Sequence, residues 1–350
     1  MSTATSREAT FHALLTAIAS LVCFVVSEAL YLEHTSLAVW TTFLVMAQYT
    51  FTSFQKGVER VVGRGVGIIC GLVLATWFND VPLVALGLIG VSLTACFYIY
   101  FSGRLAYTAL QAGLYLVAMF QIGHYEPTRA VPEAKELFAA IVLGVVVADV
   151  ITWLAGTEGD VRIQLGNVPL WPIRGEWINQ SLMLAVTVLL TLVAAHAIGL
   201  PPTTAAISVL LLTISPHLQA LIQKGELRIA GLLLAVIWSL GTFLIVGLLP
   251  YFALLAGLVC LGQFVATYLT VTGGKYSYAG LQMGLVMPMV VVAEPADFGS
   301  FTPAIERLAG IILALGASIV VGGLWPRFPL AAPPPTPTTS PAALPGEIDV

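Results

Sequence analysis

The sequence predicts an all-α integral membrane protein with about twelve transmembrane helices in two parallel six-helix repeats. Of its 350 residues, 58% are hydrophobic and only 9% are charged, and the mean hydropathy is +0.95. This composition is typical of a chain that folds in lipid. Long apolar segments recur along the chain, and polar motifs recur at matching places in its two halves. The few basic residues are dispersed, which excludes a nucleic-acid-binding surface.

Twelve segments approach the roughly 20 residues that a helix needs to cross about 30 Å of hydrocarbon. They are 11–31, 36–50, 62–78, 81–101, 105–122, 135–155, 178–199, 203–216, 227–249, 250–271, 276–293 and 304–325. Two of them, 36–50 and 203–216, are shorter than a full span and have the alternative interpretation of re-entrant segments. Both occupy the same place in their halves, and we expect the first segment to be retained as a helix.

The two halves align at an offset of 168 to 171 residues. FQKGVERVVG at 54–63 and IQKGELRIAG at 222–231 share Gln, Lys, Gly, Arg and Gly at the same spacing. Further aligned pairs are Tyr107 with Tyr278, Gln111 with Gln282, and Glu28 with His196. This pattern indicates an internal duplication. Because each copy has six spans, an even number, the copies are predicted to be parallel.

These predictions divide the chain into four parts. They are a first six-helix repeat at 1–155, a cytoplasmic interfacial linker at 156–177, a second six-helix repeat at 178–327 and a disordered Pro-rich cytoplasmic tail at 328–350. The four cysteines lie in apolar segments without CxxC or CxxH spacing, so we predict neither disulfides nor a metal site.

Lys and Arg residues set the predicted orientation. With the N-terminus in the cytoplasm, eleven of them fall on the inner side and three on the outer side, which favours cytoplasmic N- and C-termini. The inner residues are Arg7, Lys56, Arg60, Arg64, Arg104, Arg162, Arg174, Lys224, Arg228, Lys275 and Arg327, and the outer ones are Arg129, Lys135 and Arg307.

Motifs for enzyme catalysis are absent from the sequence. It contains no GxxxxGK[ST], HExxH or GxSxG motif, so we predict no catalytic residues and no cofactor, and not an enzyme. On the same ground, we expect no ATP-driven transport by this chain alone.

The repeated basic stretch is the first candidate binding site. Lys56, Arg60 and Arg64 share one helix face, and Lys224 and Arg228 repeat that spacing. Guanidinium groups bind carboxylates through two parallel hydrogen bonds, and a helix N-terminus adds positive potential. The alternative is that these residues anchor the topology by contacting lipid phosphates.

Tyr107 and Gln111, repeated as Tyr278 and Gln282, lie one helical turn apart. A phenol and an amide on one stripe can stack on and hydrogen-bond an aromatic ligand, or they can join neighbouring helices. Trp40 has two interpretations as well, an aromatic-belt anchor, which we favour, or a pocket wall.

Ionisable residues within apolar segments are candidates for proton coupling. Asp149 lies deepest and has no charged counterpart in the other half, whereas Glu28 and His196 lie near the ends of their segments. The alternatives are that Glu28 extends to the interface and that Asp149 pairs with an arginine as a structural contact.

Six spans per copy, QKGxxRxxG after a short second helix, and the closing segment ERLAGIILALGASIVVGGLWP together resemble the fusaric acid resistance and aromatic acid exporter family of bacterial inner-membrane proteins. The six-span unit is more distantly similar to the plant aluminium-activated malate transporters. The family's longer members carry a large cytoplasmic domain, where this chain has 22 linker residues. The positions that match the family's basic stretch are Lys56, Arg60, Lys224 and Arg228.

The resemblance implies a multi-pass inner-membrane exporter of aromatic or other weak organic acids, driven by the proton gradient and working with a periplasmic membrane-fusion partner. A passive organic-anion channel and a non-transporting scaffold subunit are the alternatives. The expected partners are a small organic anion and membrane lipids, and a homo-oligomer is compatible with the sequence. No nucleic acid is expected.

Overall fold

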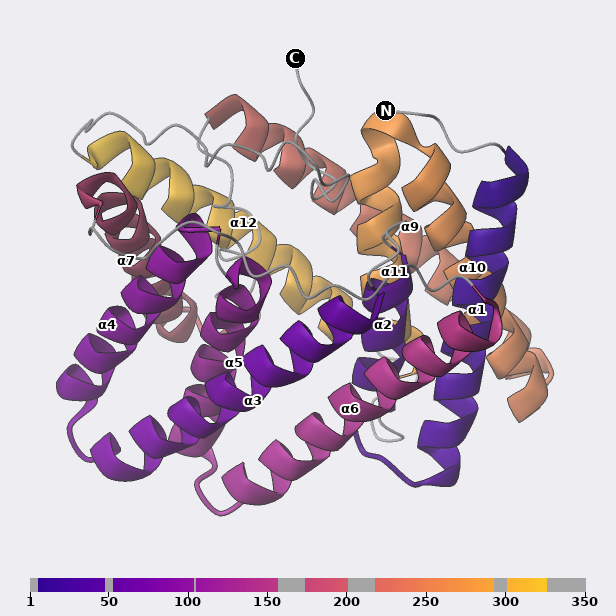
Figure 1. The fold of residues 1–350 in the computed structure, drawn as a ribbon, viewed down its shortest axis with the longest axis horizontal. Coiled ribbons are helices and arrows are strands. Elements are labelled where there is room, and N and C mark those ends of the chain that lie inside the picture. The colour runs from indigo at the N-terminus through magenta and orange to yellow at the C-terminus, as the bar shows by residue number, and fades with distance from the viewer. Residues whose placement is uncertain are drawn as a thin grey trace.

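The computed structural model describes residues 6–47, 53–103, 105–156, 174–200, 218–292 and 301–325, and in these ranges it is all-helical (Figure 1). The first half contains α1 (Ser6–Ala29), α2 (Thr35–Met46), α3 (Ser53–Phe78), α4 (Pro82–Phe101), α5 (Ala106–Tyr125) and α6 (Ala130–Leu154). The second half contains α7 (Gly175–Ala197), α9 (Leu218–Leu248), α10 (Phe252–Thr272), the short η1 (Gly274–Tyr276), α11 (Ser277–Val291) and α12 (Thr302–Leu324).

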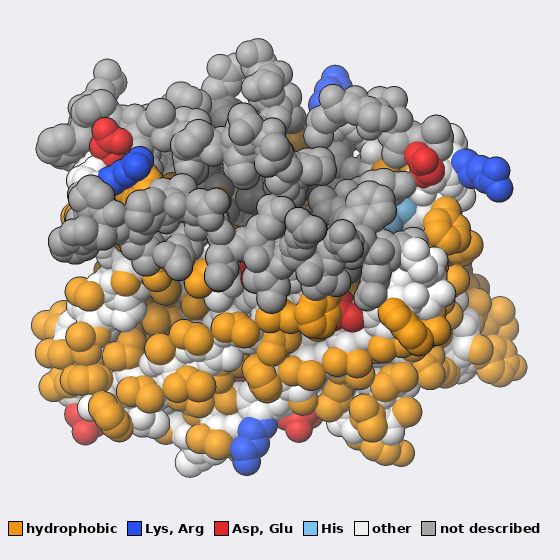
Figure 2. Space-filling model, viewed as in Figure 1, with side chains coloured by type: hydrophobic (Ala, Val, Ile, Leu, Met, Phe, Trp, Pro, Cys, Tyr) orange, Lys and Arg blue, Asp and Glu red, His pale blue; other side chains and the backbone are white. Residues whose placement is uncertain are grey.

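Eight of the described helices are long and apolar enough to cross a membrane, so the chain is a multi-pass membrane protein. They are α1, α3, α4, α6, α7, α9, α10 and α12. Hydrophobic side chains form a broad band over the described part of the face in Figure 2, and Lys and Arg side chains lie near its margins. The predicted segment 203–216, the tail 328–350 and most of the linker lie outside the described residues.

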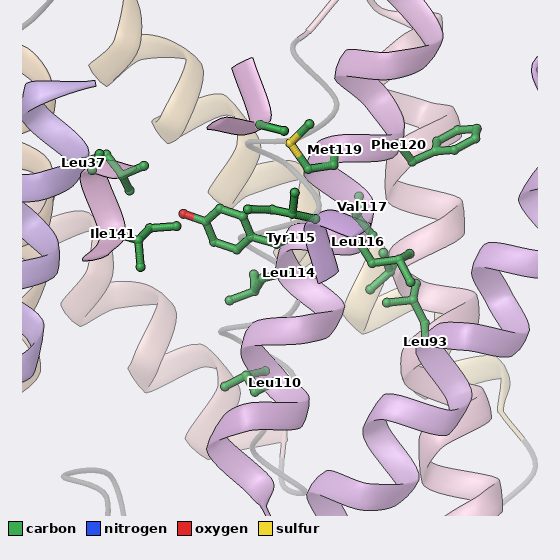
Figure 3. Packing of buried hydrophobic residues seen from close by; sticks show 14 of the residues in the cluster. Leu37, Leu93, Leu110, Leu114, Tyr115, Leu116, Val117, Met119, Phe120 and Ile141 are labelled. Atoms are coloured by element: carbon green, nitrogen blue, oxygen red, sulfur yellow. The ribbon is translucent and has the colours of Figure 1, made fainter. Parts of the chain in front are cut away.

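The remaining longer helices, α2, α5 and α11, lie inside the bundle. Residues on all sides of α5 and α11 are buried, and Figure 3 shows side chains of α5 pointing in several directions into the surrounding protein. Protein neighbours rather than lipid therefore surround these two helices. This explains how they carry polar Tyr and Gln residues and, for α11, only 15 residues.

Glycines bring α3 and α5 into backbone contact. Gly63, Gly67 and Gly71 recur every four residues on α3, and a Cβ at any of them would overlap backbone atoms of α5. On α9, Gly231 lies in the same way against a carbonyl oxygen of α11. Small residues at this spacing let membrane helices approach closely. The same local packing thus occurs once in each half.

The short helix α2 lies at the centre, beside α6 and α11 (Figure 1). Thr42 Oγ1 donates a hydrogen bond to the Gly144 carbonyl of α6 at 3.0 Å, and the Phe43 ring lies directly on Gly284 of α11. Trp40 packs against both hydrophobic clusters of the molecule. This helix therefore connects the two halves.

Candidate functional site

Both basic stretches lie within helices. α3 begins at Ser53 and α9 at Leu218, about nine residues before the predicted apolar segments at 62 and 227. Arg60 is seven residues into α3, about 10 Å along its axis, and Arg228 is ten residues into α9, about 15 Å along. The motif begins within the first two turns of each helix, but both arginines lie deeper, so neither is at the positive end of a helix dipole.

Arg60 and Arg64 are fully buried, with exposed fractions of 0% and 1%. The Arg60 Nη1 group donates a hydrogen bond to the Tyr107 hydroxyl at 2.7 Å. One turn further along α3, Arg64 Nε donates to Gln111 Oε1 at 2.8 Å, and its Nη1 donates to Thr41 Oγ1 of α2 at 3.1 Å. The crossing of α3 and α5 thus pairs each arginine with one residue of the Tyr and Gln stripe.

Aromatic rings cover these guanidinium groups. The Trp40 ring centroid lies 5.1 Å from Arg60 Cζ and 4.9 Å from Arg64 Cζ, and the Tyr115 ring lies 4.7 Å from Arg64 Cζ. Such distances place the cations over the electron-rich ring faces. The favoured interpretation of Trp40 as a belt residue was wrong, because its ring packs on the buried arginines.

The positive charge of Arg60 and Arg64 is not neutralised by an acidic partner in the described residues, and some of their hydrogen-bond donors have no acceptor. Arg60 Nε and Nη2 are buried without a hydrogen-bond partner in the described part of the chain. Neither Arg60 nor Arg64 forms an ion pair with an acidic side chain in the described residues, unlike Arg129, which pairs with Glu126. A buried guanidinium with unused donors can accept an anion or a water molecule as a further partner. We call Trp40, Arg60, Arg64, Tyr107 and Gln111 the N-terminal arginine site.

The second half contains a related cluster. Arg228 is fully buried and interacts electrostatically with Tyr278, while Gln282 lies against Gly231, one turn after Arg228. A second guanidinium comes from Arg307 of α12, which is 8% exposed and interacts electrostatically with Arg228 and Tyr278. We call Arg228, Tyr278, Gln282 and Arg307 the C-terminal arginine site.

These positions change the count of basic residues behind the predicted orientation. Arg307 was assigned to the outer side and Arg228 to the inner side, yet they come from helices that pack on each other, α12 and α9, and they interact electrostatically. Both belong to the helix interior, as do Arg60 and Arg64. Arg307 was missed as a site residue, although an arginine inside an apolar segment is itself a recognisable indication of function.

The lysines and Asp149 lie next to these sites. Lys56 and Lys224 are half-buried, one turn before Arg60 and Arg228. On α6, a carboxylate oxygen of Asp149 would lie 3.3 Å from a Cβ added at Gly57, so this carboxylate packs against the first turns of α3. The structure therefore brings Asp149 to the basic stretch of the first half.

Glu28 and His196 lie elsewhere. Both are exposed, Glu28 at the end of α1 and His196 in the last turn of α7. The His196 Nδ1 atom lies 2.7 Å from the Tyr125 hydroxyl, and the two rings are stacked. Within the described ranges, no group of three or more His, Cys, Asp or Glu residues is placed to hold a metal ion.

Comparison with known families gives one match. No curated protein and no solved structure matches the chain. Residues 21–134 match the family model described as fusaric acid resistance protein-like. That segment runs from α1 into α6 and contains every residue of the N-terminal arginine site. The predicted resemblance to the fusaric acid resistance family is thereby confirmed over residues 21–134 of this multi-pass membrane protein.

Proposed function

We propose that the protein is a proton-coupled secondary exporter of aromatic or other weak organic acids. In this proposal it spans a bacterial inner membrane with twelve helices in two parallel six-helix repeats, has both termini in the cytoplasm and catalyses no reaction. The observation that carries the proposal is the buried pair Arg60 and Arg64, which has unused hydrogen-bond donors. The family match over the same residues supports transport as the activity.

The burial of two neighbouring cations carries a free-energy cost that another interaction has to offset. An unpaired charge taken out of water costs several kcal/mol, and two like charges add repulsion in a medium of low dielectric. An arriving carboxylate offsets both terms, because it supplies the missing negative charge and accepts hydrogen bonds from Arg60 Nε and Nη2. We therefore assign the carboxylate of the substrate to Arg60.

The surroundings of the pair favour an acid with an aromatic body. Trp40 and Tyr115 place ring faces and edges beside the guanidinium groups. Flat π systems stack on such rings and on the guanidinium plane, with about 0.5–1.5 kcal/mol for a well-placed aromatic pair. A benzoate-like ligand satisfies both the cations and the rings.

The other predicted residues take roles along one route. Lys56 and Lys224 attract the anion near the two sites, and Arg228, Tyr278 and Gln282 provide a second binding position. Asp149 packs beside Gly57, three residues before Arg60, which suits a carboxyl that exchanges a proton as the anion binds or leaves. Glu28 and His196, exposed at helix ends, are proposed as proton-exchange groups at the membrane surface.

A passive organic-anion channel is the second candidate, since a buried arginine cluster also stabilises anions that pass through a pore. A non-transporting scaffold subunit is less consistent with unused buried donors. The periplasmic membrane-fusion partner implied by the family belongs to the exporter proposal alone. A homo-oligomer is compatible with each candidate.

Efflux of benzoate from liposomes containing the purified protein tests the proposal. We expect benzoate flux that depends on an imposed proton gradient and falls about tenfold or more in Arg60→Leu, because the charge-assisted hydrogen bonds to the carboxylate are lost. Arg129→Leu removes an exposed arginine and serves as the control. Flux that persists without a proton gradient would select the channel, and unchanged flux in a folded Arg60→Leu protein would exclude this binding site.

A further inference from the structure

The two arginine sites obtain their second guanidinium from different helices. Arg64 of α3 aligns with Leu232 of α9, whereas Arg307 of α12 aligns with Leu137 of α6. Packing supports this alignment, because Val145 of α6 abuts Gly57 and Leu315 of α12 abuts Gly225 at matching positions. The second arginine therefore stands on a different helix in each half, and in each half it interacts electrostatically with the first.

This exchange leaves polar atoms unused in the second half. Gln111 Oε1 accepts a hydrogen bond from Arg64, but Gln282 Oε1 is buried without a partner in the described residues. Arg307 is in a similar state, since its Nε has no partner there and its Nη1 donates only to the weak acceptor Met289 Sδ at 3.3 Å. Buried polar atoms without partners are rare and costly, so they indicate a bound ligand or water.

The aromatic residues of the first half are not repeated in the second. Tyr115 aligns with Val286, which is buried in α11. Trp40 aligns with Ser208, which lies outside the described ranges. The group that contacts the Arg307 guanidinium is instead the thioether of Met289, whose Sδ lies 3.3 Å from Nη1. The C-terminal arginine site therefore has two arginines, as its counterpart has, but no aromatic residue at the positions that align with Trp40 and Tyr115.

We propose that Arg228 and Arg307 form a second anion site, which binds carboxylates by charge alone and does not prefer an aromatic acid over an aliphatic one. Arg307 is the residue that completes it. The contrast with the N-terminal arginine site rests on the proposed function, because that proposal assigns the aromatic preference to Trp40 and Tyr115. The second site itself requires only equilibrium binding and no transport.

Equilibrium binding of radiolabelled benzoate and acetate to the full-length protein in lipid nanodiscs tests this assignment. In Arg60→Leu, which removes the guanidinium assigned to the substrate carboxylate in the first half, the remaining anion binding should show similar affinities for benzoate and acetate. In Arg307→Leu, the remaining binding should favour benzoate by about tenfold, and the other class should weaken by about tenfold or more, as the loss of charge-assisted hydrogen bonds predicts. Arg129→Leu, which removes an exposed arginine, should change neither class.

Thermal unfolding of each variant checks that it folds. Should Arg307→Leu fail to fold, Arg307→Lys provides the second measurement, because it keeps the charge, loses the planar fork and should weaken acetate binding severalfold. The same benzoate-to-acetate ratio in Arg60→Leu and Arg307→Leu would overturn the proposal. If Arg60→Leu abolishes benzoate efflux while Arg307→Leu leaves the affinity for acetate unchanged, only this inference fails. If efflux is absent but an Arg307-dependent acetate site remains, only the proposed function fails.

Discussion

The N-terminal and C-terminal arginine sites share a backbone framework and differ in how they place charge. In both, an arginine on a glycine-containing helix faces a Tyr and Gln stripe, on α3 and α5 in one half and on α9 and α11 in the other. The second guanidinium comes from Arg64 in one site and from Arg307 in the other. Backbone contact at glycines thus sets how the two helices cross in each half, while the helix that supplies the second arginine differs.

This difference indicates what the sites require. Two neighbouring cations repel each other in a buried location, so a structural role would be served better by a single arginine. Nevertheless, each half contains two, Arg60 with Arg64 and Arg228 with Arg307, and they arise from non-equivalent positions. A shared need for paired positive charge, as in binding an anion, accounts for both arrangements.

The largest effect is expected at the shared helix crossings. Gly63→Ala and Gly231→Ala would each place a Cβ against a carbonyl oxygen of α5 or α11, and because backbone cannot move aside locally, each should lose about 3 kcal/mol of stability. Gly87→Ala and Gly241→Ala, which face open space on helices, are the controls and should change stability by less than about 0.5 kcal/mol. Denaturant unfolding in detergent micelles measures this. Equal stability of all four would show that the crossings tolerate separation.

A second pair of glycines distinguishes the halves. Gly284 of α11 lies directly under the Phe43 ring of α2, whereas the aligned Gly113 of α5 has its nearest neighbour, a Leu93 methyl group, 3.5 Å from an added Cβ. Gly284→Ala should therefore cost about 1–3 kcal/mol of stability through overpacking. Gly113→Ala should be nearly neutral, because its added methyl meets ordinary van der Waals contact. Similar losses in both variants would contradict the central placement of α2 against α11.

Apolar segment lengths predicted the helices well. Eleven of the twelve predicted segments correspond to helices in the described ranges. The structure also joins Arg60 to Tyr107, two positions that the duplication singled out separately. Most helices start within three residues of the predicted position, but α1, α3, α6 and α9 start five to nine residues earlier. Hydropathy leaves out polar turns such as the one containing Lys56, although these turns continue the helix.

Other site residues could not be found from the sequence for physical reasons. Depth was inferred by counting residues from loops, which assumes that helices are upright, and this separated Arg307 from Arg228. The aromatic contacts of Trp40 depend on how α2 packs between the halves, and no periodicity of a single segment encodes that. Burial of Arg60 was likewise hidden, because a basic residue near the end of an apolar run resembles a topology anchor.

Moving the second arginine of the first half from α3 to α6 tests whether the helix that supplies it matters for anion binding. Arg64→Leu alone should weaken anion binding in the first half by about tenfold, which corresponds to about 1.4 kcal/mol. Adding Leu137→Arg rebuilds the arrangement of Arg228 and Arg307 in the first half. We expect the double variant to recover acetate binding while Trp40 still favours benzoate, as measured by equilibrium binding. If Leu137→Arg recovers nothing, the two arrangements are not equivalent.

The smallest effect is expected from the phenol that holds Arg60. Tyr107→Phe removes the hydroxyl that accepts from Arg60 Nη1 at 2.7 Å, and one such hydrogen bond contributes about 1 kcal/mol. If the bond fixes the guanidinium for the anion, the KM for benzoate should rise about fivefold with kcat nearly unchanged. Tyr278→Phe, the matched change in the other half, should leave the benzoate KM unaltered. A lower KM in Tyr107→Phe would instead mean that the hydroxyl competes with the substrate for Arg60, because the freed Nη1 donor would add to the two that are already unused.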